Sequence, residues 1–286
     1  MRDFLQLLLV AILVMVVGAG VYVSIFGDDV ELRLVVDHVD GDVSINSGDS
    51  SRSPVAGEML ETSDWITTGV GGRVGLSIGE GTRIELASES RMEILGSGEN
   101  GLQVALANGR IRARVRPGGE QLSVSADGRE ITAVEADFGV AIDGGGRLGL
   151  ETTRGEVTLL GFGDIEALGA GERIIVTGLN EPPVVERLPT NLLLEVEWPD
   201  QPSSSSAFRV RGITEPGALV WVERVGVRVQ ARAGSDGVFE ITGIPLEEGD
   251  NKLTLYSENM FGHTTMSEGE VERDSQAPIG DFEILY

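Results

Sequence analysis

The sequence predicts an all-β protein that is attached to a membrane by one N-terminal helix. Apolar and polar residues alternate in short segments that recur about every eight to twelve residues, as in antiparallel β folds. The chain also has 40 glycines among 286 residues, which is typical of a folded protein with many tight turns. A third observation, an uncharged apolar run from Phe4 to Phe26, predicts the membrane helix.

The run from Phe4 to Phe26 holds 23 residues without a charged side chain, and about 20 apolar residues suffice to cross the hydrocarbon core as a helix. Arg2 precedes the run and three acidic residues follow it within 28–31. This bias predicts an inner-membrane helix with its N-terminus inside and residues 28–286 in the periplasm or another extracytoplasmic space. A cleaved signal peptide with an apolar core at 7–17 is the alternative; the length of the run favours a retained anchor.

The composition excludes several functional classes. The chain carries 46 acidic and 22 basic residues, for a net charge of −24, which argues against nucleic acid as a partner. Cys is absent, so disulfides, thiolate metal sites and a Cys nucleophile are excluded. The two histidines, His38 and His263, are far apart in the chain and do not form a common zinc motif. We therefore expect neither a metal nor another cofactor.

Six segments in the first half of the chain have the period-2 alternation of β-strands. They cover residues 73–78, 82–87, 91–95, 102–106, 110–116 and 122–126. The sequences Gly79-Glu80-Gly81 and Asn108-Gly109 between them predict hairpin turns. An apolar stripe with a helical period does not follow these segments, which argues against an α/β enzyme fold.

Four arginines alternate with apolar residues in the segment at 110–116. They are Arg110, Arg112, Arg114 and Arg116. In a strand, all four guanidinium groups project from one face. Such a row could bind a ligand that carries carboxylate or phosphate, because a guanidinium group binds these through two hydrogen bonds. The alternative, which we favour, is pairing with acidic residues of neighbouring strands such as Glu85 or Glu93.

Two motifs with catalytic precedents lie in unsuitable contexts. The segment Gly75-Leu76-Ser77-Ile78-Gly79 matches the nucleophile elbow G-x-S-x-G, but it lies within a predicted strand and no helix follows. Gly144, Gly146 and Gly149 match G-x-G-x-x-G, but a strand pattern follows where a dinucleotide site needs a helix, so we favour a hairpin turn. We expect no catalytic residues and no enzymatic activity.

Turn and strand residues form an ordered series between 41 and 173. The series is Gly41-Asp42-Val43, Gly57-Glu58 with Leu60, Asp64, Ile66 and Thr68-Gly69, Arg73-Val74 with Leu76, Gly81-Thr82, Glu85-Leu86, Ser90 with Glu93, Leu106 with Gly109-Arg110, Thr132-Ala133 before Asp137-Phe138 and Val140, Gly155-Glu156-Val157, and Gly171-Glu172-Arg173. This series resembles the FecR domain, and the resemblance implies a periplasmic β module over residues 28–180. The family is best known for passing a signal from an outer-membrane transporter to an extracytoplasmic sigma factor. With Met1 to Asp3 alone before the apolar run, the resemblance implies a recognition or scaffold module more than a transcriptional regulator.

Composition shifts at Glu181-Pro182-Pro183, which predicts a linker over 181–190 and a second module over 191–274, followed by a tail at 275–286. The second module resembles a bacterial Ig-like β-sandwich. The residues that carry this resemblance are Gly212, Glu215-Pro216-Gly217-Ala218, Val220, Asp236-Gly237, Phe239, Leu246, Gly249, Asn251, Leu253-Thr254-Leu255, Asn259 and Gly262. Within it, Trp221 is either a core or interface residue, which we favour, or a platform on which a sugar ring stacks.

Taken together, the sequence predicts a membrane helix at 1–27, a FecR-like β domain and an Ig-like β-sandwich. We expect a non-catalytic envelope protein that binds or scaffolds a ligand or protein through these two modules. Signal transduction of the FecR type, after a periplasmic partner is sensed, is the first alternative. Binding of cell-wall glycan through Trp221 or the arginines is the second. The expected partner is therefore an envelope protein or a cell-wall polymer.

Overall fold

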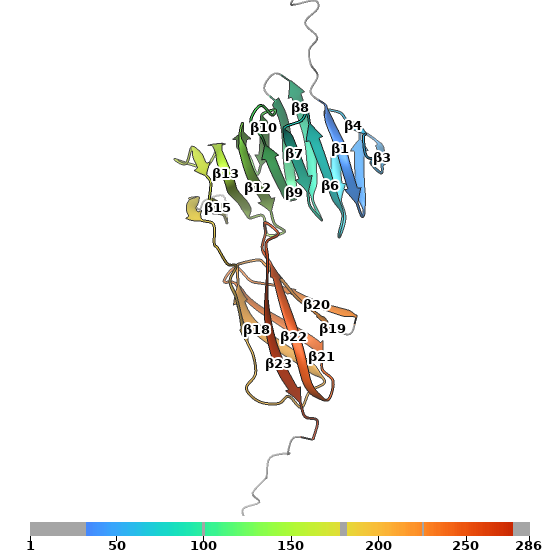
Figure 1. Ribbon diagram of the computed structural model, residues 1–286, viewed down its shortest axis with the longest axis vertical. Coiled ribbons are helices and arrows are strands. Elements are labelled where there is room, and N and C mark those ends of the chain that lie inside the picture. The colour runs from blue at the N-terminus through green and yellow to red at the C-terminus, as the bar shows by residue number, and fades with distance from the viewer. Residues whose placement is uncertain (1–32, 99–100, 178–181, 225, 277–286) are drawn as a thin grey trace, which may run out of the picture.

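Figure 1 shows the computed structural model, which describes residues 33–98, 101–177, 182–224 and 226–276. Within these ranges the chain forms 23 strands and no helix, which confirms the all-β prediction. Accordingly, none of the described segments is a helix able to span a bilayer. The helix predicted at Phe4–Phe26 and the end of the predicted tail, 277–286, lie outside the described residues.

The first module comprises two sheets that face each other across one core. Sheet A joins, in spatial order, β4 (Met59–Leu60), β1 (Leu34–Asp40), β6 (Arg73–Ile78), β7 (Thr82–Leu86), β9 (Gly101–Val115), β12 (Ala136–Ile142), β13 (Leu148–Leu160), β15 (Glu172–Val176) and β16 (Val184–Arg187). Sheet B joins β3 (Ser50–Arg52), β2 (Val43–Ser47), β5 (Trp65–Thr68), β8 (Arg91–Gly98), β9, β10 (Leu122–Ala126), β11 (Arg129–Ala133), β13 and β14 (Ala167–Gly169). The pairs are antiparallel except β9 with β10.

Two long strands, β9 and β13, belong to both sheets. The first half of β9 pairs with β8 and β10 in sheet B, and its second half pairs with β7 and β12 in sheet A. Gly109 lies at this corner of β9 with a φ of 87°, and Gly155 lies at the corresponding corner of β13 with a φ of 73°. Left-handed backbone favours Gly because it has no Cβ. The prediction of a hairpin turn at Asn108-Gly109 is therefore wrong: this glycine bends one continuous strand from sheet to sheet.

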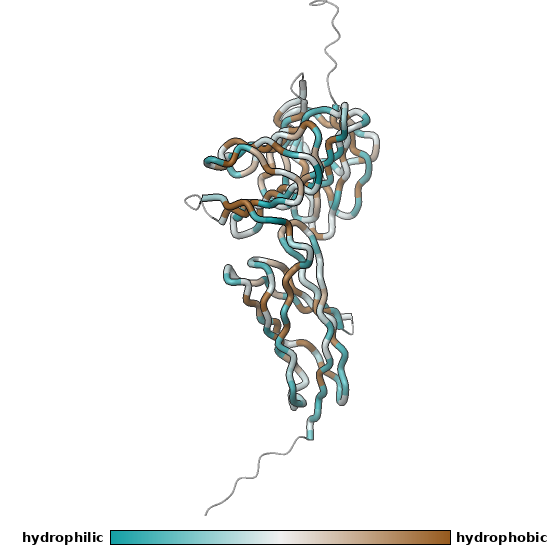
Figure 2. Tube along the Cα trace, turned by 60° about the vertical axis from the view of Figure 1, so that its left-hand side comes forward, coloured by the Kyte–Doolittle hydropathy of each residue, from teal (hydrophilic) through white to brown (hydrophobic). Residues whose placement is uncertain are grey.

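Alternation along each strand places the apolar side chains between the sheets. In the part of β9 that belongs to sheet A, Ile111, Ala113 and Val115 are buried whereas Arg112 and Arg114 are exposed. Phe138 and Phe162 are the largest fully buried side chains of this core. Figure 2 shows the resulting mixture of apolar and polar positions along the backbone trace of both modules. Burial of this apolar surface is the main force that holds the two sheets together.

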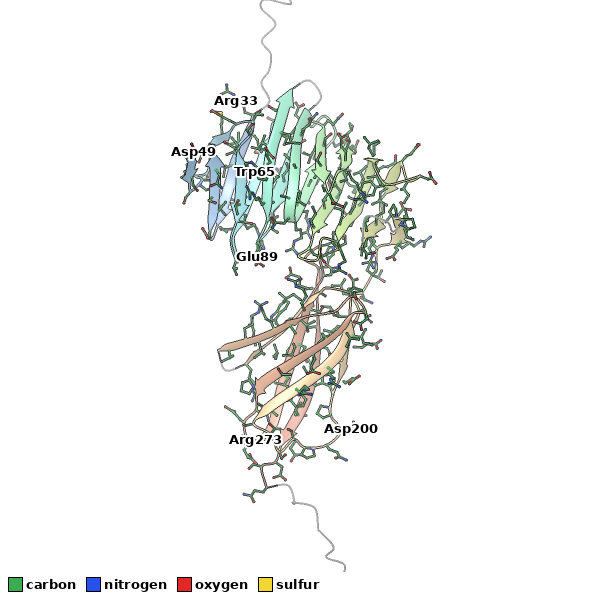
Figure 3. All side chains as sticks on the ribbon, turned by 180° about the vertical axis from the view of Figure 1, so that it is seen from behind. Arg33, Asp49, Trp65, Glu89, Asp200 and Arg273 are labelled. Atoms are coloured by element: carbon green, nitrogen blue, oxygen red, sulfur yellow. The ribbon has the colours of Figure 1, made fainter. Side chains whose placement is uncertain are left out.

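The second module is a smaller pair of sheets with a separate core. Sheet C joins β17 (Leu194–Glu197), β18 (Ala207–Thr214) and β21 (Val238–Pro245); sheet D joins β20 (Val227–Arg232), β19 (Leu219–Arg224), β22 (Gly249–Glu258) and β23 (Thr264–Arg273). Phe239, Ile244 and Leu255 are buried between these sheets. The two modules are arranged end to end, so that Arg33 and Arg273 lie at opposite ends of the molecule (Figure 3). Strand β16 falls within the range 181–190 that the composition favours as a linker.

We predict that Gly109→Ala destabilises the protein far more than Gly48→Ala. Both glycines have a positive φ, which costs an L-residue about 1–2 kcal/mol. A Cβ at Gly109 would also lie 2.1 Å from Oγ of Ser90, whereas a Cβ at Gly48 meets nothing within 4 Å. Urea unfolding of the purified protein is expected to show a loss of about 1 kcal/mol for Gly48→Ala and at least about 3 kcal/mol for Gly109→Ala. Equal losses would contradict the role assigned to this corner.

Candidate functional site

A groove of about 440 Å³ crosses the outer face of sheet A next to the second module. Most of its charged or imidazole-bearing lining residues come from the first module, and one comes from the second. They are Asp37, His38, Arg83, Glu85, Arg112, Arg114, Asp137, Glu151 and His263. The groove is therefore a polar site with charges of both signs.

Strand register creates the floor of the groove. Gly75 of β6 pairs with Glu85 of β7, which pairs with Arg112 of β9, and Arg112 pairs with Gly139 of β12. Side chains at paired positions of adjacent strands share a face of the sheet. The two glycines leave gaps in this row. The ring of His38 occupies the gap at Gly75. A Cβ at Gly75 would lie 2.1 Å from Cε1 of His38.

An irregularity in β1 directs two consecutive residues to the groove. Val36 pairs with Leu76 and His38 pairs with Gly75, so Asp37 is an extra residue in the strand. A bulge of this kind breaks the alternation of faces. As a result Asp37 and His38 both line the groove. Asp37 accepts hydrogen bonds from the hydroxyl of Ser77, at 2.6 Å, and from Arg83, at 3.2 Å.

The predicted arginine row exists, but its members have different surroundings. Arg110 donates to Glu258 of the second module at 2.9 Å. Arg112 and Arg114 line the groove, whereas Arg116 follows the end of β9 outside it. Arg114 lies 3.5 Å from Asp137 of the neighbouring strand.

Cross-strand pairing, the favoured interpretation of the row, holds for Arg114 and not for its neighbours. Glu85 is paired in register with Arg112, but its ion pair is with Arg73, at 3.4 Å. Glu93, proposed as a second acidic neighbour, is wrong for this role because β8 places it in sheet B. Among the described residues, Arg112 and Arg116 have no carboxylate within ion-pair distance.

Trp221, on the outer face of sheet D, is not among the residues that line the groove. Its ring stacks against Tyr256, with centroids 5.4 Å apart and an interplanar angle of 16°. The guanidinium group of Arg228 lies 4.4 Å from the centroid of the same ring. Trp221 thus belongs to a surface cluster outside the groove. Its stacking partner Tyr256 lies two positions before Glu258, which binds Arg110, so the cluster adjoins one end of the arginine row.

The groove ends at a buried carboxylate that the second module covers. Glu151 of β13 is 2% exposed, and its two oxygens lie 2.8 and 2.9 Å from Nε2 of His263. An ionised carboxylate only accepts hydrogen bonds, so with Glu151 ionised the donor in this contact is Nε2 of His263. A buried carboxylate without a partner would be strongly unfavourable. His263 therefore satisfies a charge that lies 112 positions earlier in the chain.

The loop that carries His263 is preorganised and fits a space left by glycine. The side-chain oxygen of Asn259 accepts hydrogen bonds from the backbone N–H groups of Phe261 and His263. Phe261 is 2% exposed. A Cβ at Gly149 of β13 would lie 2.7 Å from Cζ of Phe261 and 2.8 Å from Cε of Met260. Close contact between the loop and sheet A thus requires Gly at position 149.

One further ion pair and one further hydrogen bond join the modules. Arg173 of β15 binds Glu215 of the second module at 3.0 Å. Arg147 donates at 2.7 Å to the carbonyl oxygen of Pro216 and also binds Asp143. Burial alone would raise the pKa of Asp143, but hydrogen bonds from the backbone and guanidinium group of Arg147 outweigh it and hold that pKa below its usual value.

Neither catalytic motif assembles a site. Ser77 of the G-x-S-x-G segment lies within β6 and donates to Asp37, and the described residues include no hydrogen bond from Ser77 to a histidine. Gly144 and Gly146 form the turn between β12 and β13, as predicted, in which the N–H of Gly146 bonds to the carbonyl of Asp143. The described residues contain no group of three or more His, Asp or Glu side chains suited to a metal ion.

Sequence reasoning missed Glu151, His263 and Phe261 as parts of one site. Asn259 and Gly262 signal a turn between two strands, but a turn motif does not say what the turn contacts. The pairing depends on the register of β13 within sheet A and on how the second module sits against it.

Comparison with known proteins identifies a domain in the first module. Residues 64–158 match the FecR protein family, so this stretch is a FecR family domain and the expectation from the sequence is confirmed for it. The match ends before the second module. No curated protein matches the sequence.

The similarity to solved structures is low. The crystal structure of a "putative anti-sigma factor" from Parabacteroides distasonis is similar at 18% identity and a TM-score of 0.38; the similarity covers 43% of this chain and 59% of that protein, less than two thirds of its length. A tetra-tandem repeat in the extending region of a large adhesion protein is similar at 14% identity and a TM-score of 0.25, covering 87% of this chain and 68% of the other. Likenesses this low carry no argument about fold or function.

We predict that Asp143 contributes stability that acid removes. Because its pKa in the folded protein is below the usual value of 3.8, the contribution is complete above that pH and is lost as the pH falls through the lower, folded-state pKa. Asp143→Asn should therefore reduce the free energy of unfolding at about pH 6 and reduce it much less at about pH 2. Urea titrations at both pH values measure this. A loss of equal size at both would contradict the assignment.

Proposed function

We propose that this chain is a signal-transduction component of the FecR type, in which the first module binds a partner and the second module responds to the binding. The observation that carries the proposal is the position of the FecR family domain. Residues 64–158 contain Arg83, Arg112 and Arg114 of the groove, and they also contain Glu151, on which His263 of the second module is seated. One domain therefore supplies both the candidate binding surface and the contact through which binding reaches the rest of the protein.

The coupling follows from shared residues. His263 lines the groove and is also hydrogen-bonded to Glu151. A partner in the groove would contact His263 or displace it. Displacement would leave the buried Glu151 carboxylate without its hydrogen-bond partner, which is energetically unfavourable. Binding would thus change the balance between docked and undocked arrangements of the two modules.

The proposed setting is the cell envelope. In this proposal the run from Phe4 to Phe26 anchors the protein in the inner membrane with its N-terminus inside, and residues 28–286 are extracytoplasmic, where they meet an envelope protein. The second module is proposed as Ig-like, which is supported by its two packed sheets of three and four strands. The proposed role is binding without catalysis or a cofactor.

A scaffold that holds an envelope partner without transmitting a signal is the second candidate. It was the favoured expectation from the sequence alone. The hydrogen bonds and ion pairs between the modules support it, because a fixed geometry suits a spacer as well as a sensor. The FecR family match supports signalling more strongly, since transmission is what the family is best known for. Glycan binding through Trp221 is supported least, because Tyr256 and Arg228 already contact its ring.

Transcript measurements in the native host test the signalling role. We expect deletion of the gene to change a defined set of transcripts several-fold and the wild-type gene to restore them. Gly149→Leu should fail to restore them, because the side chain would overlap Phe261 and Met260. Gly144→Leu is the matched control, since a Cβ there meets nothing within 4 Å, and it should restore them. A deletion strain whose transcripts equal those of the wild type would contradict signalling and would leave the scaffold role as the remaining candidate.

A further inference from the structure

Two arginines of the groove stand directly opposite each other. Arg83 of β7 is paired in register with Arg114 of β9, and both line the groove. Like charges at directly opposed positions of antiparallel strands are unfavourable. The chain has only 22 basic residues against 46 acidic ones, so this opposition is not a consequence of an abundance of arginine. Asp37 beside Arg83 and Asp137 beside Arg114 offset part of this repulsion, and an anion bound between the two arginines would offset more of it.

A third arginine lies two positions along the same strand. Arg112 projects from the same face of β9 as Arg114. Its side-chain contact among the described residues is a long hydrogen bond, 3.4 Å, to the carbonyl oxygen of Phe261. Arg83 and Arg114 each lie near an aspartate, at 3.2 and 3.5 Å. Arg112 is therefore the groove arginine best placed to bind a new carboxylate.

The wall of the groove also has unused hydrogen-bonding capacity. Oδ1 of Asp137, which lines the groove, is buried and lacks a hydrogen-bond partner, as do Nε and Nη2 of Arg154, which is not a lining residue. The two side chains face each other at 3.8 Å, beyond hydrogen-bond range. Unsatisfied buried polar atoms are rare because each is costly. The unpaired acceptor of Asp137 suits a ligand that offers a donor, as the N–H group of a peptide backbone does.

The shape of the groove indicates an extended occupant. Its lining residues come from six adjacent strands of sheet A, β1, β6, β7, β9, β12 and β13, and strands are spaced about 4.8 Å apart, so the groove is roughly 24 Å long. An extended chain rises about 3.3 Å per residue, which corresponds to about seven residues.

From these observations we infer that the groove binds an extended peptide segment of the partner and that Arg112 holds a carboxylate side chain of that segment. The inference rests on the proposed function, since it names the chemistry of the partner at the same site. Arg83 and Arg114 lie together on one side of the bound carboxylate, two positions along β7 and β9 from the pair of Glu85 and Arg112. His263 places the second module at one end of the segment. The net charge of −24 repels a polyanion at long range, so the segment carries one or two acidic residues rather than a run of them.

Selection of random heptapeptides by phage display against the full chain tests this inference and does not require the partner to be identified. The wild-type protein should select peptides enriched in Asp or Glu. Arg112→Glu and Arg112→Gln should both lose the enrichment, and a selected peptide should bind each of them at least about tenfold more weakly, as expected for a lost charge-assisted hydrogen bond. Arg112 is exposed, so these variants should keep the wild-type melting temperature.

Arg116→Glu is the matched control, because it makes the same change of charge in the same row but outside the groove. It should select and bind the same peptides as the wild type. The inference is overturned if the wild type selects no acidic peptides, if Arg112→Glu keeps the enrichment, or if Arg116→Glu loses it equally. These outcomes are independent of the transcript measurement: peptide binding without a transcriptional effect refutes signalling alone, and a transcriptional effect without acidic selection refutes the peptide site alone.

Discussion

The carboxylate of Glu151 is the constraint on which the arrangement of the two modules depends. It is almost fully buried in sheet A, and among the described residues its hydrogen-bond partner is His263 of the second module. Removing a charge from water is unfavourable unless the charge is paired. Seating of the loop at 259–263 pairs this charge and at the same time covers the space above Gly149. The surrounding ion pairs, Arg110 with Glu258 and Arg173 with Glu215, are less buried and add orientation more than stability.

Much of the local structure could be predicted from the sequence, because alternation is a local signal. The strands around 73–126 and the common face of the arginines follow from a period of two. The corner at Gly109 could not be predicted in this way, because a glycine in a tight hairpin and a glycine in a bent strand both need a positive φ. The partnership of Glu151 with His263 depends on tertiary register, which a single sequence does not encode locally.

The candidate site depends both on the local strand pattern and on tertiary register. The arginine row, visible in the sequence, becomes a groove only because Gly75 and Gly139 leave gaps beside it and because a bulge turns Asp37 and His38 to the same face. The groove becomes a candidate signalling site only because the second module contributes His263 to its lining. Binding and module docking therefore share side chains, and a change in one has an energetic effect on the other.

The central claim is that the two modules are held together as one body by the contact around Glu151. The chain has no cysteine, so spin labels at two introduced cysteines report without background. Gln103→Cys and Glu270→Cys place them on exposed strand positions of the two modules. Double electron–electron resonance is expected to give one narrow distance distribution for the otherwise unchanged protein and a broad one when Gly149→Leu is added. A broad distribution without Gly149→Leu would contradict the account.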